Sequence, residues 1–167
     1  MSMKQPARLI VSIIFGAYVL LMLWLLFGQR LGYYDIPGTY WDKLQYSLNL
    51  VPGETINDYI DMATGAVNPY LVRHALINLA GNIVMFIPLG FLLPCLWPRL
   101  RSFGRFLPAI GAIIVGIELT QLFTLLGSCD IDDLLLNTIG AVIGFGLLRL
   151  VDKLRLRKAS RKGDGKG

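Results

Sequence analysis

Four long apolar segments constrain this chain more than any other feature of its sequence. A helix needs about 20 apolar residues to cross the hydrocarbon core of a bilayer. Stretches that meet this requirement occur at residues 9–27, 75–97, 106–126 and 133–151. Only 16% of the residues are charged, well below the roughly 25% of an ordinary soluble domain. The sequence therefore predicts an all-α integral membrane protein, built as a bundle of four transmembrane helices.

The first apolar segment could also be a cleaved signal peptide. Lys4 and Arg8 precede it, as in a basic n-region. The apolar run is longer than the roughly 7–15 residues of an h-region, and no A-x-A cleavage site follows it. We therefore expect the segment to be retained, so that residues 1–152 form one transmembrane domain and residues 153–167 a basic cytoplasmic tail.

The distribution of charged residues predicts how the bundle is oriented. All but three of the 16 Lys and Arg residues lie near a terminus or between the second and third segments. Basic residues in short connections mark the cytoplasmic side of a membrane. The acidic residues instead gather in the other connections: Asp35, Asp42, Glu54, Asp58, Asp61, Asp130, Asp132 and Asp133. Both termini are therefore expected to be cytoplasmic in a multi-pass protein.

The cysteine and histidine residues exclude several kinds of site. In this topology Cys95 and Cys129 fall on opposite sides of the membrane, so we expect no disulfide between them. No CxxC or Cys/His spacing suggests zinc, and His74 is the only histidine, which excludes a multi-histidine metal site. The basic tail is explained by topology, so no nucleic-acid partner is predicted.

The connection between the first two segments, residues 28–74, is the only long one. Thr55 and Asp58 resemble a capping box, and an apolar stripe follows at helical spacing, formed by Ile56, Tyr59, Ile60 and Ala63. This pattern predicts a short extracytoplasmic interfacial helix that ends at Gly65, Asn68 and Pro69. The tyrosines and tryptophans of the connection are typical of an aromatic belt at the membrane interface.

Polar side chains recur at helical spacing in three of the four segments. They are Asn78 and Asn82 in the second, Glu118 and Gln121 in the third, and Asp130, Asp133 and Asn137 in the fourth with the turn before it. Spacings of three and four put each set on one face of its helix. All of them fall in the outer half of the bundle, and charged groups are costly inside a membrane. We therefore expect an outward-facing polar pocket that binds a ligand.

Other polar residues near this pocket have less specific interpretations. Arg73 and His74, at the outer entrance of the second segment, are candidate ligand-binding partners of the carboxylates or simple interface anchors. The amides of the set could equally act as hydrogen-bond contacts between helices. Asp132 breaks the stripe and is expected to face solvent or cap the helix. Ser128 and Cys129 are interpreted as turn residues.

The polar set is compatible with either binding or catalysis. Glu118, Asp133 and Asp130 are the candidates for general acid–base catalysis. Carboxylate and amide oxygens could also hold a divalent cation such as Mg²⁺ or Ca²⁺, although nothing in the sequence requires a cofactor. No G-x-S-x-G motif or other nucleophile signature is present, so enzymatic activity is left open.

Three blocks of the sequence resemble the VanZ-like family. The first is the hexapeptide at residues 47–52, SLNLVP, and the second is the segment at residues 82–90, NIVMFIPLG. The third begins with ELTQ at Glu118 and continues through residues 130–133 to NTIG at Asn137. Gly53 departs from the family pattern, which often has an aromatic residue at that position.

The resemblance implies a protein of the bacterial plasma membrane. The founding member is associated with resistance to teicoplanin, a glycopeptide antibiotic that carries a lipid tail. Membrane lipids are the expected partners, together with a lipid-linked cell-wall precursor or a lipoglycopeptide, in a role in resistance or envelope homeostasis. The alternative is an intramembrane enzyme that acts on a lipid-linked cell-wall or phospholipid substrate through carboxylate acid–base chemistry. The ligand and the oligomeric state are not defined by the sequence.

Overall fold

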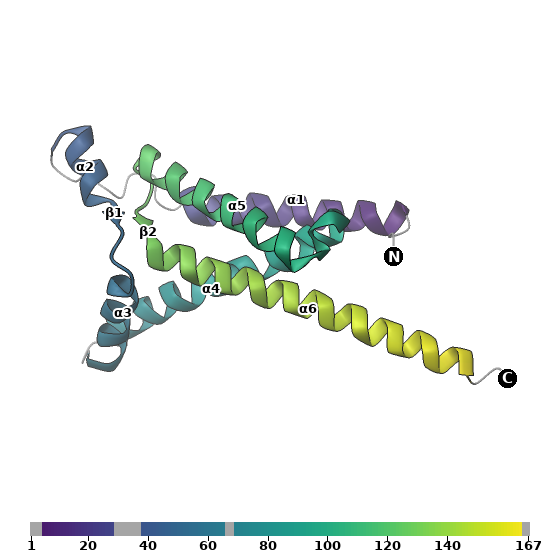
Figure 1. Ribbon diagram of the computed structural model, residues 1–167. Helices are drawn as coiled ribbons and strands as arrows, with labels where there is room; N and C mark the ends of the chain where they lie inside the picture. Colours follow the sequence, from purple (N-terminus) through teal and green to yellow (C-terminus); the bar gives the residue numbers. More distant parts are fainter. Residues whose placement is uncertain (1–4, 29–37, 66–68, 165–167) are drawn as a thin grey trace.

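Four long helices dominate the computed structural model, which describes residues 5–28, 38–65 and 69–164 (Figure 1). They are α1 (Gln5–Phe27), α4 (Pro69–Leu96), α5 (Phe103–Thr124) and α6 (Ile131–Asp164). Each contains a window that is long and apolar enough to cross a membrane. The prediction of a helical protein with four membrane-spanning segments is confirmed by length and composition.

All four long helices begin before the apolar segments that predicted them, and α4 and α6 extend the furthest beyond theirs. Helix α4 begins at Pro69, before the apolar stretch, and α6 continues past residue 151 to Asp164. Residues 152–162 of this extension are rich in Lys, Arg and Leu and contain no Gly or Pro, a composition that favours helix. The first part of the basic tail therefore continues the last helix without a break.

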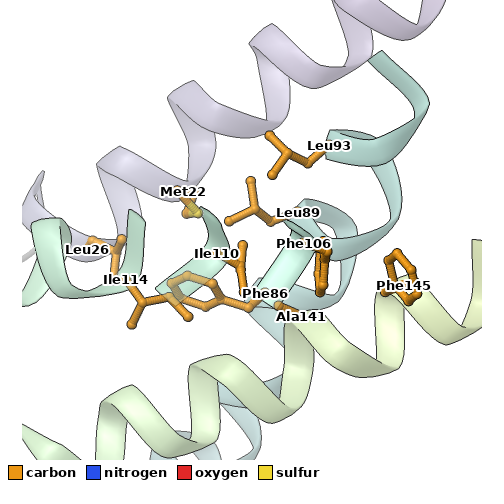
Figure 2. Packing of buried hydrophobic residues seen from close by; sticks show 10 residues of the cluster. All are labelled: Met22, Leu26, Phe86, Leu89, Leu93, Phe106, Ile110, Ile114, Ala141 and Phe145. Carbon is orange, nitrogen blue, oxygen red and sulfur yellow. The ribbon is translucent and has the colours of Figure 1, made fainter. Parts of the chain in front are cut away.

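The hydrophobic core draws side chains from all four long helices (Figure 2). Its members are Met22, Leu26, Phe86, Leu89, Leu93, Phe106, Ile110, Ile114, Ala141 and Phe145. The rings of Phe106 and Phe145 stack with their centroids 4.5 Å apart, which joins α5 to α6. This core fixes the relative positions of α4, α5 and α6, the helices that carry the predicted polar residues.

Helices α4 and α6 form the most extensive contact between elements in the described part of the chain. Small residues allow their backbones to approach closely, as is common for helices packed within membranes. A Cβ atom added at Gly140 or Gly144 of α6 would collide with a backbone carbonyl of α4, at Ile83 or Ile87 respectively. The four-residue spacing of these glycines therefore fixes the register of α6 against α4.

One end of the bundle carries two short helices and a pair of two-residue strands. These are α2 (Tyr40–Tyr46), β1 (Leu48–Asn49), α3 (Glu54–Gly65) and β2 (Cys129–Asp130). The start of α1, near the N-terminus, and the last turns of α6, near the C-terminus, lie at the opposite end of the bundle (Figure 1). There the 3₁₀ helix η2 (Pro98–Arg101) joins α4 to α5, and Arg101 forms an ion pair with Asp152 at 3.2 Å.

The short helix predicted after residue 53 is present, but its start is built differently. Helix α3 begins at Glu54, so Thr55 lies inside its first turn rather than at its cap. The Thr55 hydroxyl donates to the Asp130 carboxylate instead of capping the helix. A capping box does occur at the unpredicted helix α2, where Thr39 and Asp42 exchange hydrogen bonds.

Candidate functional site

A short parallel strand pair brings the connection after α1 against the turn before α6. Leu48 pairs with Cys129 and Asn49 pairs with Asp130, and the Cys129 N–H donates to the Ser47 carbonyl at 2.8 Å. These segments are about 80 residues apart in sequence. The pairing places the first and third of the sequence blocks described above side by side.

Asp130 is the centre of the polar contacts at this junction. Its carboxylate oxygen Oδ2 accepts the Thr55 hydroxyl at 2.5 Å and the Asn49 side-chain amide at 3.4 Å. Its other oxygen accepts the backbone N–H of Asp132 at 2.8 Å, which stabilises the start of α6 in the manner of an N-cap. Three neutral donors from three segments therefore hold this buried carboxylate in one position.

Asp132 caps a helix other than its own. Its side chain is 1% exposed, so the expectation that it faces solvent is wrong. Its two carboxylate oxygens accept the backbone N–H groups of Gly53 at 2.7 Å and Ile56 at 3.1 Å. Gly53 immediately precedes α3, and Ile56 lies in its first turn, where backbone N–H groups have no intrahelical acceptors. A carboxylate at this position is also favoured by the helix dipole.

Glu118 lies beneath the strand pair with only 3% of its side chain exposed. One carboxylate oxygen accepts the Asp130 backbone N–H at 3.3 Å, and the other accepts the Asn137 side-chain amide at 3.4 Å. The other polar atom of the Asn137 side chain, Oδ1, is buried without a hydrogen-bond partner among the described residues. Gln121 donates instead to the Leu26 carbonyl of α1 at 3.3 Å.

A second set of polar contacts joins α4 to α6, next to the buried contacts of Glu118. The Asn82 side-chain amide donates to the Asp133 carboxylate. Asn78 lies one turn away on the same face of α4, and both asparagines are partly exposed. The predicted convergence of polar stripes from α4, α5 and α6 is therefore present in the structure, as two layers of contacts.

A cavity of about 890 Å³ opens beside this second set of contacts. Its polar lining includes Thr55, Tyr59, Tyr70, Asn78, Asn82, Ser128, Asp130 and Asp133. Its apolar lining comes from α1 and α4 and includes Leu21, Met22, Leu25, Leu26, Val84, Met85 and Pro88. The cavity is thus polar where α3, α4 and α6 meet and apolar along the seam between α1 and α4.

The predicted site residues divide into those that line the cavity and those that support it. Asn78, Asn82, Asp130 and Asp133 line it, whereas Glu118, Gln121 and Asn137 are buried and do not. Arg73 is exposed on α4 and is not part of the lining. The side chain of His74 lies outside the described residues. The sequence did not predict that the tyrosines at the polar end and the residues of α1 line the cavity.

The described residues give little support to metal or thiol chemistry at this junction. Among them, no group of three or more His, Cys, Asp and Glu side chains could hold a metal ion. Cys129 is a free thiol, and its burial, followed by the charges of Glu118 and Asp130, raises its pKa above the usual range. A protonated thiol is a poor nucleophile, in keeping with the interpretation of Cys129 as a turn residue.

Comparison with known protein families identifies a match to the family described as VanZ/LLP1, over residues 15–152. The matched region includes all three sequence blocks, the strand pair and every described residue that lines the cavity. It confirms the family resemblance expected from those blocks. No similar protein was found among the curated proteins, and no similar structure among the solved structures.

Proposed function

The chain belongs to the VanZ/LLP1 family, and on that premise we propose that its cavity binds an amphiphilic molecule of the bacterial cell envelope. The candidates are an envelope lipid, a lipid-linked cell-wall precursor and a lipoglycopeptide such as teicoplanin. A role in glycopeptide resistance or envelope homeostasis would follow from such binding. The protein would act as a multi-pass component of the plasma membrane.

The observation that carries this proposal is the division of the cavity into a polar and an apolar end. Asp133 and Asn82 stand at the polar end, and Leu25 and Met85 stand along the apolar seam. Apolar surface removed from water contributes about 25 cal/mol per Å², while polar groups fix orientation. A ligand with both kinds of surface fits this lining better than a wholly polar solute does.

We also propose that the polar end faces the outside of the cell. The basic residues near the termini and between α4 and α5 support a cytoplasmic location for the opposite end, because such residues are retained on the cytoplasmic side. The ligand would then enter from the outer leaflet. That is where lipid-linked precursors and lipid-tailed glycopeptides meet the plasma membrane.

Substitution of two carboxylates tests the proposal. Asp133→Asn removes the charge from the cavity wall, and Glu118→Gln removes it from the layer beneath. Asp58→Asn is the matched control, because Asp58 is exposed on α3 and does not line the cavity. We expect the first two variants to lose ligand binding, and protection against teicoplanin where the wild type confers it, at unchanged membrane levels. Full wild-type binding and protection in both variants would refute the proposal.

The second candidate function is an intramembrane enzyme acting on a lipid-linked or phospholipid substrate. It is favoured by two carboxylates, Asp130 and Asp133, which share the wall of the cavity with several hydroxyl groups, among them that of Ser128. Asp133 would be the acid or base, with or without a divalent cation. The test is to incubate purified protein with envelope lipid extracts and analyse the products. A new lipid species that Asp133→Asn abolishes would establish the enzyme, and unchanged lipids would leave the binding function.

A further inference from the structure

The end of α6 that lies furthest from α3 carries a row of basic side chains on one face. Arg149, Lys153 and Arg157 follow one another at intervals of four residues, which places them on one side of the helix. All three members of this basic row are exposed. The last turns of α6 extend away from the other helices (Figure 1), so the row is open to whatever surrounds the protein.

The charges of the basic row have no carboxylate partner among the residues that the structure describes. Asp152 is the only acidic residue between Asp133 and Asp164. Its carboxylate forms the ion pair with Arg101 at 3.2 Å, so its charge is already matched by a residue outside the row. The row therefore presents a positive charge that an anionic partner would neutralise.

Exposed leucines lie beside the basic row. Leu147, Leu150 and Leu154 are 44%, 52% and 53% exposed, and their spacings of three and four place them on a neighbouring face of α6. Lys153 and Arg157 each follow one of these leucines by three residues, so charged and apolar groups adjoin on the same turns. The partner that matches this surface has an anionic group next to hydrocarbon, which describes a phospholipid and not a nucleic acid.

The packing of α4 on α6 indicates the depth of this surface in a membrane. The two helices run in the same direction, because the contacts of Gly140 and Gly144 advance together along both of them. Trp97 lies ten residues beyond Ile87, which is the contact of Gly144, so it is level with the last of the exposed leucines. Trp97 is itself 49% exposed, and tryptophan rings favour the membrane–water interface. The basic row therefore crosses the interface.

The length of α6 gives the same depth. About 20 helical residues cross the hydrocarbon core, and counted from Ile131 at the start of α6 they end at Leu150. At 1.5 Å per residue, Lys153 lies about 5 Å and Arg157 about 10 Å beyond that point. The headgroup layer is about 5–8 Å thick, and long basic side chains reach along a helix to find it. The whole row is therefore within reach of lipid phosphates.

We propose that this surface of α6 binds an anionic phospholipid, with its phosphate at the basic row and an acyl chain along Leu150 and Leu154. The site is separate from the cavity and does not depend on the ligand proposed for it. Guanidinium groups form paired hydrogen bonds with phosphate oxygens, and each basic residue near the surface adds to the attraction for anionic lipid. Phosphatidylglycerol has the required charge.

Native mass spectrometry of the full-length protein, titrated with three lipids of equal chain length, tests the headgroup. Phosphatidylglycerol has a net negative charge, whereas phosphatidylethanolamine and phosphatidylcholine carry the same phosphate together with a cation. We expect phosphatidylglycerol to bind about tenfold more tightly than either, and inorganic phosphate at the lipid concentration not to displace it. Equal binding of the three lipids would overturn the proposal. Displacement by inorganic phosphate would also overturn it, because the row would then bind free phosphate and not a lipid.

Lys153→Glu locates the site on the protein. The helix should accept this change, because a glutamate four residues from both Arg149 and Arg157 forms stabilising pairs with them. Lys43→Glu is the matched control, since it makes the same change of charge on α2 at the other end of the bundle. We expect Lys153→Glu to abolish the preference for phosphatidylglycerol at an unchanged melting temperature, and Lys43→Glu to retain it. Lys153→Gln, which removes the charge without reversing it, should reduce the preference severalfold. An equal loss in Lys153→Glu and Lys43→Glu would reflect net charge alone and would overturn the site.

Discussion

Asp132 Oδ1 accepts the backbone N–H of Gly53 at 2.7 Å, so the first turn of α6 holds the start of α3. The same carboxylate accepts the Ile56 N–H, and Thr55 between them bonds to Asp130. Helix α3 contributes Thr55 and Tyr59 to the cavity lining. The position of one wall of the cavity therefore depends on two acidic residues at the start of α6.

Replacing Asp132 by alanine should destabilise the protein and loosen α3. The change leaves the N–H groups of Gly53 and Ile56, at a partly buried helix start, without their carboxylate acceptors. This should lower the free energy of unfolding by about 1–2 kcal/mol. Thermal unfolding of the detergent-solubilised protein measures this loss, and limited proteolysis near Gly53 reports the loosening. Asp58→Ala on the exposed face of α3 is the control and should leave both unchanged. Equal melting temperatures for the two variants would contradict the capping role.

The glycines of α6 should differ sharply in their tolerance of alanine. A Cβ atom at Gly144 would collide with the Ile87 carbonyl, whereas one at Gly146 meets nothing within 4 Å. Gly144→Ala should therefore cost about 1–3 kcal/mol through overpacking. Gly146→Ala should leave the free energy of unfolding unchanged or raise it slightly, because alanine has a higher helix propensity than glycine. A melting temperature that falls equally in both variants would argue against close packing of α4 on α6.

The reactivity of Cys129 should rise steeply with pH. Burial raises its thiol pKa, so the protonated form persists to a higher pH in the folded protein than in an exposed cysteine. Maleimide labelling at pH 7 should be slow and should increase about tenfold per pH unit until the pKa is reached. The measurement uses the Cys95→Ser variant, in which Cys129 is the remaining cysteine. The reference is a second variant that has a cysteine in place of the exposed Tyr46 and serine in place of both native cysteines. Equal rates at the two positions would contradict the partial burial of Cys129.

The same thiols test the orientation of the protein in the membrane. Cys129 lies in β2 at the end of the bundle that carries α3, and Cys95 lies near the other end of α4. A membrane-impermeant maleimide applied to intact cells at high pH should label Cys129 and spare Cys95. Labelling of Cys95 but not Cys129 would reverse the proposed orientation.

The sequence predicted the parts of this structure that depend on local pattern. The four spans follow from runs of apolar residues, and the presence of polar stripes near one end of α4, α5 and α6 follows from helical spacing. The contact between Asn82 and Asp133 was not itself predicted. The partners of Asp132 and Glu118 could not be predicted in this way. They depend on the turn after α5, where Leu125 adopts a left-handed conformation, and on the β1–β2 pair between distant segments.

The wall contributed by α1 was also beyond sequence reasoning, for a different reason. Leu21 and Leu25 belong to a uniformly apolar helix, and such a helix gives no periodic signal for the face that meets a neighbour. The choice of α4 as that neighbour depends on tertiary packing around Met22 and on the contact between Tyr18 and Met85. The amphiphilic character of the cavity therefore emerges only in three dimensions.

The most direct test of a ligand-binding cavity is an experimental structure of the protein crystallised from a lipidic phase that contains lipids extracted from bacterial membranes. We predict density for an amphiphile, with its polar group within hydrogen-bonding distance of Asp133 and a chain alongside Leu25 and Met85. Helix α1 packed directly onto α4, with no space between the two helices and no density at Asp133, would contradict the proposed function.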